Sequence, residues 1–190
     1  MAEFEHHAAE HYGRIMREYN LDRNELIERF GRVRDQWIAD NLDEWLAFHG
    51  FFPGVLEALK AALQSGRRIL ISTTKQERFV KAALESRGVH FPMENIYGLD
   101  RRRPKEDLLA QLQEACPPAI SFTEDRLKTL LRVETHSELD SVRLNYASWG
   151  YGTAADLESA SIDPRIHVLS LEEFNAFLAG PCADAEELPQ

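Results

Sequence analysis

The chain has 190 residues, of which 44% are hydrophobic and 28% are charged, as expected for one globular domain with a small appendage. Its formal net charge of -10 at pH 7 argues against a nucleic-acid partner, because such binding depends on lysine and arginine contacts to phosphates. No stretch approaches the roughly 18 apolar residues that a membrane span needs, and the two cysteines, Cys116 and Cys182, have no metal-ligand spacing. We therefore expect a reduced, cytoplasmic protein with no membrane or nucleic-acid partner.

Residues 1–50 are predicted to be helical. Asp22 with Glu25 forms a capping-box-like helix start, and apolar residues then recur at helical spacing on one face: Leu26, Ile27, Phe30, Val33, Trp37 and Ile38. A shorter helix is expected around residues 43–49. The Gly- and Pro-containing segment 50–54 marks a boundary between two parts of the chain.

Beyond this boundary, helical and strand patterns alternate. Strands are expected at residues 68–73, near 96–97, and at 119–123, 142–147 and 166–169, with helices between them. The last helix is predicted to start at Ser170, with Glu173 as its capping-box partner, and residues 181–190 to form a tail. Strands that alternate with helices indicate an α/β fold with parallel pairing and right-handed crossovers.

Three groups of polar residues lie where such a sheet binds ligands, at or near the carboxyl ends of its strands. Thr73 ends the first clear strand, where its hydroxyl could bind a phosphate oxygen beside a helix N-terminus. Thr74 could instead cap the next helix, with Glu77 as its partner, and this alternative stays open.

Lys105 is expected in the first turn of a helix, where a cation opposes the helix dipole unless an anion is bound nearby. Glu106 and Asp107 would also reduce that penalty. Glu124 and Asp125 end a later strand and offer carboxylate ligands for a hard cation such as Mg²⁺. Asp125 could equally be a helix cap. Together with Thr73, these residues favour a metal-assisted phosphate site.

These three groups of residues, in this order along the chain, resemble motifs of the haloacid dehalogenase superfamily, mostly Mg²⁺-dependent phosphatases. The resemblance covers roughly residues 50–180. Thr73 resembles the family's second motif, Lys105 its third, and Glu124 with Asp125 its fourth. The turn at residues 149–152 resembles a Gly-rich segment of phosphoglycolate-phosphatase-like members. The resemblance implies a three-layer, Rossmann-like α/β core at residues 51–180, an N-terminal helical cap remnant at residues 1–50 and a tail at 181–190. It also implies Mg²⁺ on Asp125 and Glu124, with Lys105 as a catalytic residue.

The family's first motif, Asp-x-Asp on a central strand, is absent from the sequence. The nearest imitation, at residues 96–100, has Arg102 where the second acid belongs. The resemblance therefore implies a phosphate-monoester hydrolase domain whose nucleophile is missing from this chain. The two strands that flank the family's central strand must then pair directly, or receive an upstream strand or a partner chain. Two alternatives are a non-catalytic module that binds a small phosphorylated molecule or a protein, and a purely structural partner.

Overall fold

The computed structural model describes residues 2–101, 103–115 and 120–180, with side chains from Glu10 onward except that of Ala115. The predicted tail, Arg102, both cysteines and the start of the strand expected at 119–123 lie outside the described residues. The chain divides into two compact units, Met1–Gly50 and Phe51–Gln190.

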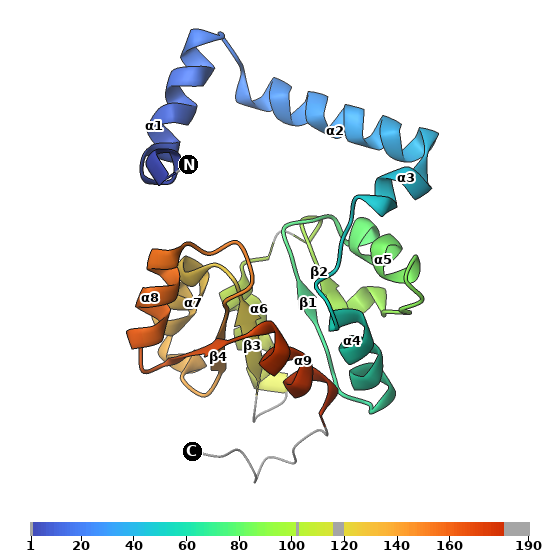
Figure 1. The fold of residues 1–190 in the computed structure, drawn as a ribbon, viewed down its shortest axis with the longest axis vertical. Coiled ribbons are helices and arrows are strands. Elements are labelled where there is room, and N and C mark those ends of the chain that lie inside the picture. Colours follow the sequence, from blue (N-terminus) through green and yellow to red (C-terminus); the bar gives the residue numbers. More distant parts are fainter. Residues whose placement is uncertain (1, 102, 116–119, 181–190) are drawn as a thin grey trace. The chain divides into compact units, whose positions relative to one another are not determined.

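The first unit contains helices α1 (Ala2–Glu18), α2 (Arg23–Asp40) and α3 (Leu42–Ala47) (Figure 1). Asp22 caps α2, as predicted, because its carboxylate accepts hydrogen bonds from the amides of Asn24 and Glu25. No residue of α2 is buried, and the side chain of Phe30 on its apolar face is 73% exposed. None of the described helices of either unit is long and apolar enough to cross a membrane.

The second unit alternates helices with short strands, which confirms the α/β class. Its α-helices are α4 (Val55–Gln64), α5 (Glu77–Glu85), α6 (Lys105–Ala115), α7 (Leu127–Glu134), α8 (Ala154–Ile162) and α9 (Leu171–Ala179). Its strands are β1 (Ile71–Ser72), β2 (Ile96–Tyr97), β3 (Ser121–Glu124), β4 (Arg143–Ala147) and β5 (Ile166–Leu169). Short 3-10 turns, Met93–Asn95 and Ser137–Leu139, precede β2 and β4.

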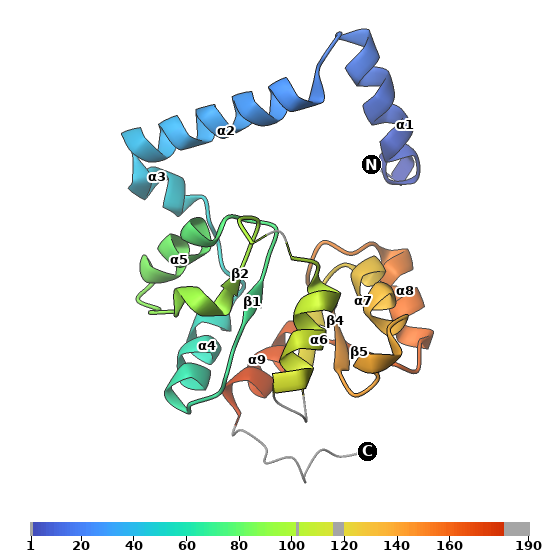
Figure 2. The ribbon, with the colours of Figure 1, turned by 180° about the vertical axis from the view of Figure 1, so that it is seen from behind.

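The strands form two separate sheets, and every pairing is parallel. β1 pairs with β2, and β3, β4 and β5 form a second sheet in that order. The strand predicted at residues 68–73 is shorter in the structure, because only Ile71 and Ser72 pair with a neighbouring strand. Figures 1 and 2 show helices on both sides of the strands, with α4 and α9 toward the viewer in Figure 1 and α6 in Figure 2.

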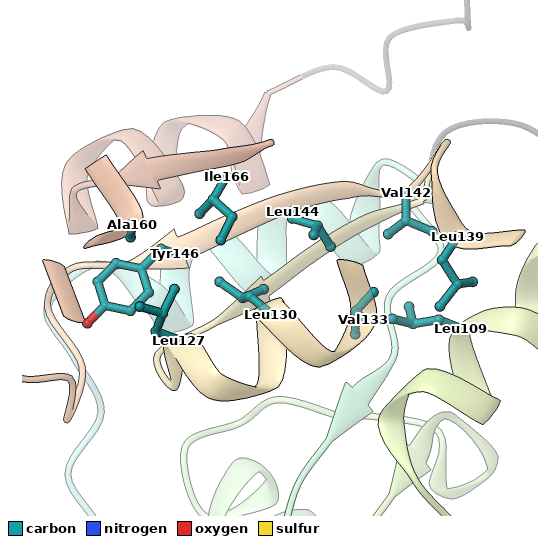
Figure 3. Close-up of a cluster of buried hydrophobic side chains, with 10 residues drawn as sticks. All are labelled: Leu109, Leu127, Leu130, Val133, Leu139, Val142, Leu144, Tyr146, Ala160 and Ile166. Carbon is teal, nitrogen blue, oxygen red and sulfur yellow. The ribbon is translucent and has the colours of Figure 1, made fainter. Parts of the chain in front are cut away.

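Each sheet has its own hydrophobic core. Side chains from α7, β4 and β5 meet around Leu130 and Leu144, both fully buried (Figure 3). The second core joins α4, α5 and β2 to Leu178 of α9. Since α9 follows β5 in sequence, its packing against α4 ties the two sheets into one unit.

Candidate functional site

Thr73 lies directly after β1, at the carboxyl end of that strand. Its amide donates to the carbonyl of Tyr97 (2.9 Å), and its Oγ1 accepts from the amide of Lys75 (3.1 Å). The hydroxyl proton is still available to an acceptor, because this side-chain bond uses only an oxygen lone pair. The structure thus places Thr73 at the sheet edge where ligands bind in open α/β folds.

The predicted cap of the following helix is wrong. Helix α5 begins at Glu77 with Gln76 as its N-cap residue, and no side chain caps it. Thr74 is exposed, and the Glu77 carboxylate accepts from the amide of Gly98 in the turn after β2. The reason is tertiary: backbone amides far away in sequence compete successfully for the Glu77 carboxylate.

Glu77 is a buried carboxylate that sequence reasoning missed. It accepts hydrogen bonds from the amides of Gly98 (2.9 Å), Asp100 (3.2 Å) and Arg101 (3.3 Å). Burial by itself would raise the pKa of Glu77, but hydrogen bonds from the Asp100 carboxyl and from backbone amides lower it to about 2. The same contact with Glu77 raises the pKa of Asp100. No sequence motif marks this role, since the bonded amides come from a separate loop.

Lys105 occupies the first turn of α6, as predicted, and forms an ion pair with Glu124 at the end of β3. Its Nζ also lies 5.9 Å from the centre of the Phe122 ring. Glu106, expected to offset the charge of Lys105, instead forms an ion pair with Arg132 of α7 (3.0 Å). A carboxylate from another element thus offsets the unfavourable position of Lys105 at the helix N-terminus, in addition to the acids of the first turn of α6.

Asp125 does not cap α7, whose N-cap residue is Arg126 with no side-chain cap bond. Its Oδ2 instead accepts from the amide of Tyr151 (3.0 Å), in the turn at residues 149–152. A Cβ atom on Gly150 would lie only 2.2 Å from the Cβ of Asp125. The glycine is thus required for this turn to close over Asp125.

Arg101 and Arg103 line a hollow of about 520 Å³ together with Tyr97, Pro104 and Asp107. Arg101 stacks on the Tyr97 ring (4.5 Å to its centre) and donates to two backbone carbonyls, those of Met93 and Glu94. Arg103 donates to Gln111. Both arginines thus have partners within the protein, which gives them a structural role.

The carboxylates match Mg²⁺ in chemistry but do not form a complete site. Among the described residues there is no group of three or more His, Cys, Asp or Glu side chains that could hold a metal. Glu124 already bonds Lys105 through Oε2 and the amide of Arg126 through Oε1 (3.2 Å). Because Mg²⁺ is often held by one or two carboxylates together with water and phosphate oxygens, Asp125 and Glu124 suit it only when a phosphate supplies further ligands.

The structure thus joins some of the predicted site residues directly and leaves one apart. Lys105 contacts Glu124, and Asp125 follows Glu124 but faces the glycine turn. Among the described contacts, no hydrogen bond or ion pair joins Thr73 to any of these three residues. Comparison with protein-family models, with curated proteins and with solved structures finds no match.

Proposed function

We propose that this chain is a haloacid-dehalogenase-like phosphohydrolase domain that takes a small phosphorylated molecule. The observation that supports this most directly is the ion pair between Lys105 and Glu124. It brings a cation from the start of α6 to the carboxylates at the end of β3, at the edge where parallel sheets bind their ligands. Residues far apart in sequence thereby share one place, as a phosphate site with a hard cation requires.

In this proposal Thr73 and Lys105 bind the phosphate. Thr73 donates its hydroxyl proton to a phosphate oxygen, and Lys105 neutralises negative charge on the phosphate. Asp125 and Glu124 would hold Mg²⁺, which when bound would withdraw charge from the phosphate oxygens. The glycine turn fixes Asp125 through the amide of Tyr151.

The carboxylate that would attack phosphorus does not belong to this set. The sequence has no Asp-x-Asp, and Glu124 is committed to Lys105. Without an added nucleophile, the chain alone binds the phosphorylated molecule and does not turn it over.

A second candidate follows from the same ion pair: a non-catalytic module that binds a phosphorylated ligand. Lys105 and Glu124 neutralise one another, so neither charge is left unpaired in the absence of a nucleophile. In this case Thr73, Lys105 and Asp125 support binding only. The two candidates differ in whether supplying the missing carboxylate restores turnover.

The test uses the purified chain with p-nitrophenyl phosphate and Mg²⁺, and inorganic phosphate as a thermal-shift probe. We expect no hydrolysis, together with a rise in melting temperature on adding phosphate that Lys105→Ala removes. The control is Asp140→Ala, an exposed acid at the end of a 3-10 turn, which should leave the shift unchanged.

Two results would decide against the proposal or revise it. A phosphate shift that persists in Lys105→Ala would remove the proposed binding site. Mg²⁺-dependent turnover that Asp125→Ala abolishes would show that a carboxylate already in the chain acts as the nucleophile.

A further inference from the structure

An open hollow of about 520 Å³ lies next to the proposed phosphate site; its lining residues are Tyr97, Arg101, Arg103, Pro104 and Asp107. Tyr97 ends β2, and its carbonyl accepts a hydrogen bond from the amide of Thr73 (2.9 Å). Pro104 directly precedes Lys105 at the start of α6. The hollow thus adjoins both residues that bind phosphate in the proposed function, and a molecule bound there can extend into it.

The lining of the hollow includes flat side chains that are held in place. The Arg101 guanidinium stacks over the Tyr97 ring, 4.5 Å from its centre. It also donates to the carbonyls of Met93 (3.2 Å) and Glu94 (3.1 Å), so its plane is fixed before a ligand binds. Aromatic rings and guanidinium planes are the surfaces on which nucleic-acid bases stack in proteins. The hollow therefore suits a ligand with a planar ring.

The lining also carries charges of both signs. Arg103 donates to Gln111 through Nη1, which uses one of the five N–H groups of its guanidinium. Asp107 and Gln111 are four residues apart in α6 and share one face of the helix, along which this bond holds Arg103. The Asp107 side chain is exposed, and within the described part of the chain its carboxylate forms no hydrogen bond or ion pair. The hollow thus offers both N–H donors and a carboxylate acceptor.

This combination favours a planar group that both accepts and donates hydrogen bonds. A second phosphate or a carboxylate on the ligand would suit Arg103 but would be repelled by Asp107. A sugar alone could bond both side chains but would not use the planar guanidinium of Arg101. Guanine meets all three requirements, because it is planar, accepts at O6 and N7, and donates from N1 and N2.

We propose that this hollow binds the base of a purine nucleotide, guanine in particular, whose phosphate lies at Thr73 and Lys105. Arg103 donates to O6 and N7 of the base, and Asp107 accepts from N1 and N2. The ring of the base stacks on the Arg101 guanidinium. This inference rests on the proposed function and names the class of its small phosphorylated molecule.

The test compares guanosine 5′-monophosphate with ribose 5-phosphate, which carries the same phosphate on the same sugar without the base. Calorimetric titration of the full chain in the presence of Mg²⁺ should give a Kd about tenfold lower for the nucleotide. Adenosine 5′-monophosphate lacks the O6 acceptor and the N1 and N2 donors, and should bind less tightly than the guanosine nucleotide. Inorganic phosphate reports on the site at Thr73 and Lys105 alone.

Two substitutions should bring the Kd values of guanosine 5′-monophosphate and ribose 5-phosphate together while inorganic phosphate still binds. Asp107→Ala removes the acceptor for N1 and N2. Arg103→Lys keeps the positive charge but removes the planar set of donors. The matched control is Glu114→Ala, which removes an exposed acid from the other end of α6 and should leave the ratio of the two Kd values unchanged. Because this ratio compares two ligands on one variant, a general loss of stability does not alter it.

Equal Kd values for guanosine 5′-monophosphate and ribose 5-phosphate on the original chain would overturn the inference and leave the proposed phosphate site intact. A ratio that persists in Asp107→Ala or in Arg103→Lys would also overturn it, since the base would then bind elsewhere. Equal Kd values for the two nucleotides would overturn the assignment to guanine. If inorganic phosphate and the three phosphorylated compounds all fail to bind, the proposed function fails and the inference fails with it.

Discussion

Gly150 is the residue on which the position of Asp125 depends most directly. A Cβ atom there would meet the Asp125 side chain at 2.2 Å, well inside van der Waals contact. We expect Gly150→Ala to lower the free energy of unfolding by about 1–3 kcal/mol, because the turn or Asp125 must move. Urea unfolding measures this loss, and the phosphate thermal shift should fall with it.

The matched control is Gly31→Ala in α2, where a Cβ would meet nothing within 4 Å. That substitution should raise helix stability by about 0.5–1 kcal/mol, since alanine loses less backbone entropy than glycine. Equal stability of Gly150→Ala and the original chain would contradict the close approach of this turn to Asp125.

The lowered pKa of Glu77 predicts how the free energy of unfolding depends on pH in the acidic range. Its folded pKa of about 2 lies below the ordinary value of 4.5, so the unfolded chain binds the proton more tightly. The stabilisation from Glu77 is thus fully present above pH 4.5 and is lost as the pH falls toward 2. The raised pKa of Asp100 acts in the opposite direction and reduces the net slope.

Comparison with Glu77→Gln isolates this contribution. The variant should be less stable at neutral pH and should lose less stability than the original chain between pH 4.5 and 2. Urea midpoints across this range provide the measurement. Parallel curves for the two proteins would show that the Glu77 carboxylate does not depend on the amides of the turn after β2.

At the scale of elements, the sequence predicted the caps of α2 and α9 correctly, whereas the caps considered at Thr74 and Asp125 are not formed. Ser170 caps α9 through the amide of Glu173, and the Glu173 side chain returns a bond to the Ser170 amide, as expected. Strand lengths were predicted less well, because pairing with a neighbour decides where a strand ends. Apolar residues at 69 and 70 have the strand pattern but no partner strand.

Ser170→Ala tests whether this cap matters beyond its own helix. Because α9 packs on α4, loss of the cap should lower the stability of the whole second unit by about 1 kcal/mol. The control is Ser161→Ala, whose hydroxyl bonds only the carbonyl of Leu157 within α8, and its effect should stay within about 0.5 kcal/mol. If calorimetry shows the same melting temperature for both variants, α9 does not stabilise the core.

At the scale of the whole molecule, the two units differ in how much they bury. Helix α2 has no buried residue, whereas β4 lies at the centre of a core. We expect amides of α2 to exchange with solvent rapidly and those of β4 to exchange only through global unfolding. Hydrogen-exchange mass spectrometry measures both in one experiment. Slow exchange along α2 would mean that its apolar face is covered in solution.

The sequence by itself determined the α/β class, the helix caps at Asp22 and Ser170, and the helix start at Lys105. These features depend on local spacing and on residues three or four apart, which one segment contains. Tertiary structure alone decided that Glu77 binds the turn after β2, that Lys105 pairs with Glu124, and that the described strands β1 and β3 do not pair with each other. Each of these depends on groups brought together from distant segments, where competition among partners cannot be read from spacing.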